Sequence, residues 1–197
     1  MVKNVFFTSL LLVAIVFGVS AQPPTPPFMK GGKKTNIVPT PDFLNGEKQI
    51  NVVFDYSQAK YEGDSQEKYY KGKDKAWIKE WEGERRENNA SLFTESLNSE
   101  LSAAQTGSYP KAPHTIIVVV LDCKFGTYGG PFARPAKLKC NIQFVKTGKT
   151  ETLASITLEE SQNSFSNMGT PVDFDRIALA FSEVGKSLGK QLSKVLD

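Results

Sequence analysis

The fold is decided by the stretch from His114 to Glu160, which opens with the continuous apolar run Thr115-Ile116-Ile117-Val118-Val119-Val120-Leu121. This run is short for a helix, and it is bounded by Pro113 before it and Gly126 after it. A short β-branched run of this kind is typical of a strand near the middle of a sheet, buried on both faces. A segment of buried helix is the alternative interpretation.

Two alternating segments follow the run, and each predicts a strand with one buried and one solvated face. The inward positions are Leu138, Cys140, Ile142 and Phe144 in the first segment, and Thr152, Ala154, Ile156 and Leu158 in the second. Pairing Phe144 with Thr152 in antiparallel register also sets Lys137 opposite Glu159, a pair of opposite charge. The stretch therefore predicts an antiparallel meander of three strands.

One earlier strand and two helices complete the predicted domain. Ile50, Val52, Phe54 and Tyr56 alternate with less apolar neighbours and predict the strand. A helical pattern runs from Trp77 to Ala104, with Asp74 as a candidate cap. Gly83 and the Asn88-Asn89 pair are weak points, at which we expect a bend or two abutting helices.

The clearest helix is the last one, whose apolar side chains recur at helical spacing. Its stripe consists of Phe174, Ile177, Ala178, Phe181, Val184, Leu188, Leu192 and Val195, and Asp173 or Thr170 is the candidate cap. Gly185 and Gly189 lie beside the stripe and weaken the helix by about 1 kcal/mol each relative to alanine. We expect a close approach of this helix to the sheet to explain both glycines.

The amino-terminal segments predict export. Residues 1–21 have the pattern of a secretory signal peptide, with Lys3 at the start, an apolar core and the small-residue sequence Val19-Ser20-Ala21 at the cleavage point. The apolar core is shorter than the ~20 residues that a spanning helix needs. Residues 22–41 are rich in Pro and Gly and predict a disordered or extended leader, with a proline-rich ligand as the alternative. Residues 42–197 then form a single α+β domain.

Composition and motifs exclude several classes of function. The net charge of +3 and the scattered lysines give no basic face for a nucleic acid. Gly185-Lys186-Ser187 is not a phosphate-binding loop, because position 180 is Ala180 and the triplet lies in an amphipathic helix. A single histidine, His114, and two cysteines do not make a metal site, and the sequence contains no recognisable catalytic set. We therefore expect a protein without a cofactor and without enzymatic activity.

Cys123 and Cys140 are candidates for a disulfide. If Leu121 faces Ile142 across neighbouring strands, Cys123 lies directly opposite Cys140 on the inward side. An exported protein meets an oxidising compartment, which permits such a bridge. The alternative is a pair of buried thiols that pack as small apolar groups.

Five aromatic residues are candidates for contact with a ligand or partner. They are Trp77, Trp81, Tyr61, Tyr69 and Tyr70. Closely spaced tryptophans are compatible with glycan or small-ligand binding. At this spacing they more often fix a helix to a sheet, and the tyrosines then pack a long loop onto the domain.

Three stretches carry a resemblance to known proteins: residues 44–56 (LNGEKQINVVFDY), residues 77–86, and residues 181–190 (FSEVGKSLGK). Together they resemble a group of small, uncharacterised secreted proteins of Gram-negative bacteria. The element order is also similar to that of envelope-assembly accessory domains. These are the amino-terminal domain of TolB and the periplasmic lipoproteins of curli and lipopolysaccharide export. This chain has no anchoring cysteine at its predicted cleavage point.

These observations predict a two-layer α+β domain with element order β-α-β-β-β-α. The expected sheet is mixed and four-stranded, with both helices packed on one face. The expected function is that of a non-catalytic protein, periplasmic or secreted, whose mature form does not span a membrane and binds another envelope component. A secreted protein that binds a small ligand or a glycan is the alternative.

Overall fold

The computed structural model describes residues 36–128, 133–162 and 172–196. The predicted signal peptide, most of the predicted leader and Thr170 lie outside the described residues. The strands are β1 (Gln49–Asp55), β2 (Lys60–Tyr61), β3 (Asp64–Ser65), β4 (Gln105–Gly107), β5 (His114–Lys124), β6 (Lys137–Lys146) and β7 (Thr152–Ser161). The helices are α1 (Gln66–Tyr70), α2 (Lys75–Glu80), α3 (Arg86–Asn98) and α4 (Asp173–Leu196). Two short helical turns are η1 (Asp42–Leu44) and η2 (Trp81–Arg85).

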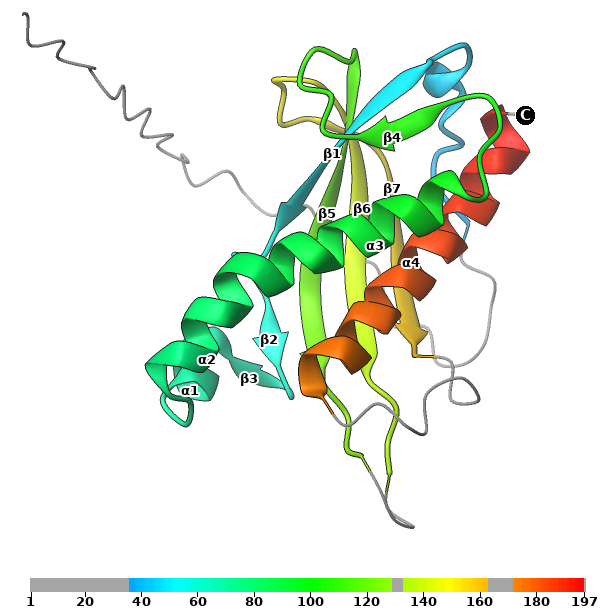
Figure 1. Ribbon diagram of the computed structural model, residues 1–197. Helices are drawn as coiled ribbons and strands as arrows, with labels where there is room; N and C mark the ends of the chain where they lie inside the picture. Colours follow the sequence, from blue (N-terminus) through cyan, green and yellow to red (C-terminus); the bar gives the residue numbers. More distant parts are fainter. Residues whose placement is uncertain (1–35, 129–132, 163–171, 197) are drawn as a thin grey trace, which may run out of the picture. The chain divides into compact units, whose positions relative to one another are not determined.

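The described elements form one mixed sheet with α3 and α4 on the same face, as Figure 1 shows. β1 runs parallel to β5 and to β4, whereas β5, β6 and β7 form an antiparallel meander. The α+β class, the mixed sheet and the four long strands are therefore confirmed. The predicted number of strands is wrong, because the short strands β2, β3 and β4 bring the described sheet to seven.

The pairing of β6 with β7 differs from the predicted register by two residues. Phe144 faces Ala154 rather than Thr152, and Glu159 faces Lys139 rather than Lys137. A shift of two keeps the side chains from Ala154 onward on their predicted faces, because the period of a strand is two. Thr152, which was predicted to point inward, is exposed, because the register shifts again between Phe144 and Val145. Ala154 and Leu158 are accordingly buried on the helix side of the sheet.

A β-bulge in β5 changes the predicted pairing with β6. Val118, rather than Leu121, faces Ile142, and the register shifts between Val120 and Asp122. The extra residue reverses the alternation of β5, so that Val118 and Val120 before the bulge and Cys123 after it are all fully buried. Period-two reasoning from sequence cannot detect such an insertion.

The predicted long helix is divided at Gly83, as the sequence indicated. Gly83 has non-helical backbone angles inside η2, between α2 and α3. Asp74 caps α2, because its Oδ1 accepts a hydrogen bond of 2.7 Å from the backbone N–H of Trp77. Asn88 and Asn89 do not interrupt α3.

The carboxyl end of α3 lies before the predicted end at Ala104. α3 ends at Asn98. The side chain of Asn98 forms hydrogen bonds with the backbone of Thr106 in β4. Asn98 Oδ1 accepts from Thr106 N at 2.7 Å, and Asn98 Nδ2 donates to Thr106 O at 2.9 Å. This pair of bonds joins β4, a strand that the sequence did not indicate, to the end of α3.

The predicted boundary between leader and domain at Asp42 is placed too late. Ile37 is buried, and Val38 forms an isolated antiparallel bridge with Ser155 of β7. The last residues of the predicted leader are therefore part of the folded domain.

Gly185 and Gly189 of α4 allow a close contact with α3. The sequence predicted a close approach to the sheet instead, and that prediction is wrong. A Cβ atom on Gly185 would overlap the backbone oxygen of Phe93 and lie 2.9 Å from its carbonyl carbon. A Cβ atom on Gly189 would lie 2.8 Å from the backbone oxygen of Leu97. The four-residue spacing puts both glycines on one face of α4, so the two helices cross with their backbones in contact.

The predicted apolar stripe of α4 packs in the core beside this crossing. Phe181 and Val184 are fully buried. The ring of Phe54 in β1 lies 5.2 Å from the ring of Phe93 in α3 and 6.2 Å from that of Phe181 in α4. One strand residue therefore contacts both helices, and the two helices form a single layer on the sheet.

We predict that Gly185→Ala lowers the free energy of unfolding by about 2 kcal/mol, because the added methyl group must displace the α3 backbone. Without that clash, the same change inside a helix would stabilise the protein by about 1 kcal/mol. Chemical denaturation measures the free energy of unfolding, and the sign of its change in Gly185→Ala therefore tests the packing of α3 against α4.

Gly72→Ala is the matched control, because a Cβ atom there meets only Tyr69 O at 3.7 Å. This variant should unfold within about 0.5 kcal/mol of the natural sequence. A Gly185→Ala protein that is as stable as the control would contradict the proposed helix crossing.

Candidate functional site

The structure brings the five aromatic candidates together in one cluster, which we call the aromatic corner. It consists of Tyr61, Tyr69, Tyr70, Trp77 and Trp81, joined by Phe125 and Phe174. α1, α2, η2 and β2 supply the five candidates, while Phe125 follows β5 and Phe174 belongs to the first turn of α4. Residues far apart in the chain thus meet at one end of the sheet.

The inner part of the corner is structural. Tyr61 and Trp81 are fully buried, and Trp81 Nε1 donates a hydrogen bond of 3.3 Å to Tyr61 Oη. Because neither ring contacts solvent, these two residues fix α2 and η2 to the sheet and do not offer a ligand surface.

The outer part of the corner is partly exposed. Tyr69, Tyr70 and Trp77 are each intermediate in exposure. The Tyr69 and Trp77 rings lie 5.8 Å apart at an interplanar angle of 62°. Burial raises the pKa of Tyr69 to about 12, and the neighbouring carboxylates of Glu62 and Asp173 add to the rise.

Arg86 is a partly buried cation of this region, and no pattern in the sequence indicated its role. Its Nη2 donates to Tyr61 Oη at 3.2 Å and to Tyr70 Oη at 3.3 Å. Its guanidinium carbon lies 4.3 Å from the centroid of the Tyr56 ring. Burial raises the pKa of Tyr56 well above its usual value, so this phenol stays neutral beside the guanidinium.

One glycosylation-type motif, Asn89-Ala90-Ser91, falls in the interior. Asn89 is only 1% exposed, on the same side of α3 as Arg86 one turn earlier. A glycan on this side chain is incompatible with the folded domain.

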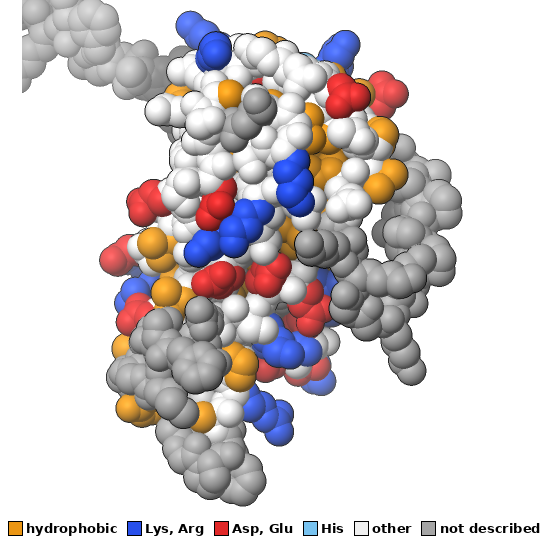
Figure 2. Space-filling model, turned by 90° about the vertical axis from the view of Figure 1, so that its right-hand side faces the viewer, with side chains coloured by type: hydrophobic (Ala, Val, Ile, Leu, Met, Phe, Trp, Pro, Cys, Tyr) orange, Lys and Arg blue, Asp and Glu red, His pale blue; other side chains and the backbone are white. Residues whose placement is uncertain are grey.

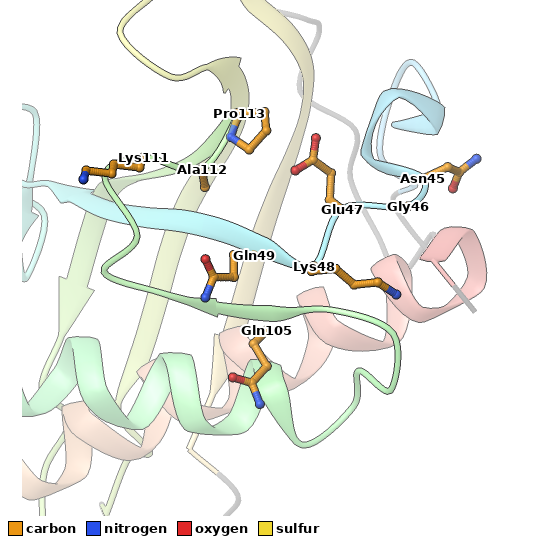
Figure 3. Close-up of a pocket in the computed structure, with 9 residues that line it drawn as sticks. All are labelled: Asn45, Gly46, Glu47, Lys48, Gln49, Gln105, Lys111, Ala112 and Pro113. Carbon is orange, nitrogen blue, oxygen red and sulfur yellow. The ribbon is translucent and has the colours of Figure 1, made fainter.

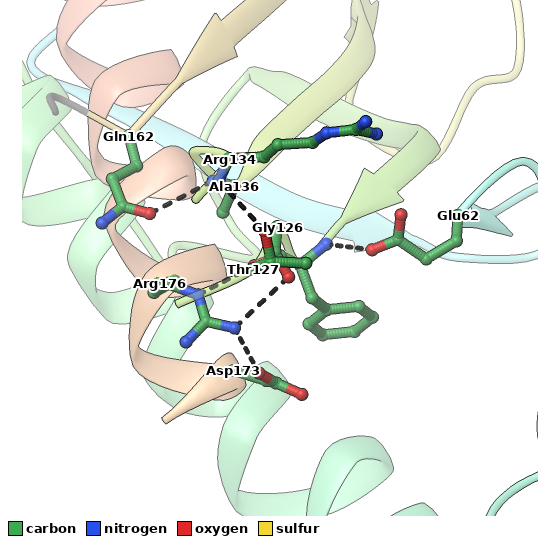
Figure 4. A network of polar contacts seen from close by, with 9 residues as sticks. Glu62, Gly126, Thr127, Arg134, Ala136, Gln162, Asp173 and Arg176 are labelled. Carbon is green, nitrogen blue, oxygen red and sulfur yellow. Dashed lines mark hydrogen bonds and ion pairs between the residues drawn. The ribbon is translucent and has the colours of Figure 1, made fainter. Parts of the chain in front are cut away.

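A polar network beside the corner connects the end of β5 to the start of α4, as Figure 4 shows. Arg176 Nε donates to the carbonyl oxygen of Phe125 at 3.1 Å, and its Nη2 is paired with Asp173. Glu62 Oε1 accepts from the backbone N–H of Phe125 at 2.6 Å. Gly126 has a positive φ, and a Cβ atom there would overlap the backbone oxygen of Arg134. The network fixes the base of the β5–β6 connection.

The two cysteines are free and buried in this structure, and the register proposed for their pairing is wrong. Cys123 faces Leu138, and Cys140 faces Val120. The two thiols therefore occupy diagonal positions, which are typically about 7–8 Å apart, whereas bridged Cα atoms lie about 4–7 Å apart. Burial raises the pKa of both thiols, and for Cys123 the neighbouring Cys140 adds to the effect.

A groove lies at the other end of the sheet, where β1, β4 and β5 begin (Figure 3). Its volume is about 660 Å³, and its nine lining residues come from the segments 45–49 and 111–113 and from Gln105. Glu47 Oε1 lies 2.9 Å from His114 Nδ1, so the carboxylate in the groove already has a partner. Lys48 and Lys111 lie at opposite sides of the view in Figure 3. The lining offers amide and ammonium groups but no pair of nucleophile and base.

The third candidate is the outer edge of β7. This ten-residue strand pairs with β6 on one side. On the other side, the backbone pairing found among the described residues is the bridge between Ser155 and Val38. Val38 N donates to Ser155 O at 3.0 Å, and Ser155 N donates to Val38 O at 2.9 Å. Successive residues of a strand direct their backbone groups to opposite sides, so the N–H of Glu159 also points away from β6.

Charges of both signs are distributed over the domain. The face in Figure 2 carries Lys or Arg and Asp or Glu side chains next to one another. Within the described ranges, no group of three or more His, Cys, Asp or Glu side chains is placed to hold a metal ion. None of the helices that the structure describes is long and apolar enough to cross a membrane.

Comparison with known proteins finds distant structural neighbours. No family model matches the chain, and no curated protein matches it. Among solved structures, the PelC dodecamer from Paraburkholderia phytofirmans in space group P6 matches with a TM-score of 0.41 and 12% identity. That match covers 76% of this chain and 97% of the other. A single-residue variant of the same dodecamer, in space group C2, matches with a TM-score of 0.42 and 12% identity, over 83% of this chain and 98% of the other.

We predict that neither thiol reacts with an alkylating agent in the native protein, because both are buried and protonated. After denaturation without a reductant, both thiols should be labelled, and intact mass should show an adduct for each of the two cysteines. A denatured chain that gains label only after reduction would instead establish the bridge.

Proposed function

We propose that this protein is a non-catalytic, exported binding protein that accepts an extended segment of another envelope component at the outer edge of β7. The observation that supports this proposal is the pair of backbone hydrogen bonds between Val38 and Ser155. A short extended segment of the chain itself already pairs with this edge, in the geometry that an added strand would use.

The remaining length of the edge suits a partner strand. Towards the end of β7, the backbone groups of Glu159 lie on the same side as those of Ser155. Unpaired groups in such a row form a template for another chain, and binding proteins use it for main-chain recognition. Among the described residues, none pairs with the outward N–H of Glu159.

The acidic side chains at the edge of β7 favour some partners over others. Glu159 is exposed, and Glu160 follows it. Two copies of this edge paired antiparallel about Glu159 would place like charges opposite each other, which destabilises a strand pair. The edge is therefore better suited to a basic segment of a different protein than to a second copy of this chain.

The envelope assignment rests on the sequence. Residues 1–21 have the pattern of a secretory signal, and three stretches resemble secreted proteins of Gram-negative bacteria. A non-catalytic role agrees with the groove, whose lining offers no pair of nucleophile and base.

We predict that a photo-crosslinking residue at position 159 gives a covalent adduct with one recurrent protein in the native cell envelope. The same residue at position 186, on the exposed side of α4, serves as the control. The position-159 adduct should be absent from the control. Equal recovery of the adduct from both positions, or its absence from both, would refute binding at the β7 edge.

Two substitutions at position 159 distinguish the contribution of the backbone N–H to binding from that of the side chain. Glu159→Pro removes the outward N–H without removing a bond to β6, so adduct formation from a crosslinker at position 161 should be lost. Glu159→Ala keeps the N–H and should retain the adduct. Thermal denaturation of both variants establishes that each is folded.

A further inference from the structure

In the outer part of the aromatic corner, the ammonium group of Lys73 lies against two aromatic rings. The ammonium nitrogen of Lys73 lies 4.7 Å from the centroid of the Tyr69 ring and 4.9 Å from that of the Trp77 ring. The planes of these two rings are inclined at 62°. The rings therefore form two walls of a cage around one positive charge, the arrangement by which proteins bind alkylammonium groups.

A third ring, Tyr70, borders Trp77, while the two rings that Lys73 contacts are Tyr69 and Trp77. Tyr70 lies 6.2 Å from Trp77 at an interplanar angle of 75°. All three rings are partly exposed, in contrast to Tyr61 and Trp81 behind them. A ligand can thus reach Tyr69, Tyr70 and Trp77 without unpacking the core of the domain.

Two carboxylates lie near Tyr69. The carboxylates of Glu62 and Asp173 lie close enough to Tyr69 to oppose its ionisation, together with burial, and so raise its pKa. Both carboxylates are fixed, since Glu62 accepts from Phe125 N and Asp173 pairs with Arg176. The carboxylate of Glu62 is therefore positioned by the fold, while Arg176 offsets the charge of Asp173 and the guanidinium of Arg86 donates a hydrogen bond to Tyr70 Oη.

Lys73 belongs to the turn between α1 and α2, and its backbone N–H is bonded to Tyr70 O at 3.0 Å. The position of the backbone is thus fixed, while the side chain can leave the rings by rotation about its own bonds. Within the part of the chain that the structure describes, the ammonium group forms no ion pair, so the two rings are its main contact.

We propose that Tyr69 and Trp77 form a binding site for an alkylammonium group, and that the Lys73 side chain occupies this site in the free protein. The ligand chemistry is that of a quaternary ammonium head group or of a lysine side chain on another molecule. This site is independent of the β7 edge, which uses backbone groups of a different element.

The test is tryptophan fluorescence during titration with tetramethylammonium chloride, with sodium chloride at equal ionic strength as the reference. Lys73→Ala opens the cage, so this variant should bind tetramethylammonium about fivefold or more tightly than the natural sequence, the factor of an ordinary cation–π contact. Lys75→Ala is the matched control, because Lys75 is an exposed lysine of the same region, and this variant should titrate like the natural sequence.

A second variant distinguishes binding by the aromatic rings from a general effect of charge on the fluorescence. Tyr69→Leu in the Lys73→Ala protein removes one wall and should abolish the saturable change, while thermal denaturation confirms that the protein is folded. The proposal is overturned if Lys73→Ala shows no saturable response beyond sodium chloride, or if its affinity equals that of the natural sequence.

Two further ligands distinguish the sources of the ammonium group in the Lys73→Ala protein. Tighter binding of choline than of Nα-acetyl-lysine amide would assign the cage to a quaternary head group. The opposite order would assign it to a lysine side chain. Failure of both ligands to bind would overturn the site, whatever the outcome of crosslinking at β7.

Discussion

The contact between the backbones of α3 and α4 is the constraint on which the rest of the structure depends. Gly185 and Gly189 leave no room for a Cβ atom against Phe93 and Leu97, and a hydrogen bond of 2.7 Å between Ser96 and Ser182 lies beside them. Because the helices touch along their backbones, they form one thin layer on the sheet. Phe54 of β1 can then contact Phe93 and Phe181 at once. The core of the domain is closed by this layer.

This arrangement leaves two features at the margins of the core. The helices cover one face of the sheet, and at the outer edge of β7 Val38 pairs with Ser155. At one end of the sheet, the segment between β1 and α3 folds into the aromatic corner, which Arg86 and Arg176 fix through bonds to Tyr61 and to Phe125. The surfaces proposed for binding are thus the outer edge of β7 and partly exposed rings that pack against the core.

Much of the fold follows from the sequence, and the errors have specific physical causes. The β-branched run at residues 115–121 and the apolar stripe of α4 correctly predicted the central strand and the last helix. Alternation determines faces but not register, so the pairing of β6 with β7 was displaced by two residues. The bulge after Val120 was not predicted because it lies in a continuously apolar run, where alternation cannot show an inserted residue. Periodicity also says nothing about which layer a glycine approaches, and Gly185 was therefore assigned to the wrong neighbour.

Amide hydrogen exchange along β7 of the isolated protein, measured by nuclear magnetic resonance, tests strand addition most directly. The N–H of Leu158 points to β6 and should be strongly protected, whereas the N–H of Glu159 points outward and should exchange close to the rate of an unfolded chain. Addition of the envelope partner should then protect Glu159. Equal protection of Glu159 and Leu158 in the isolated protein would mean that the edge is already covered, and would contradict strand addition as the mode of binding.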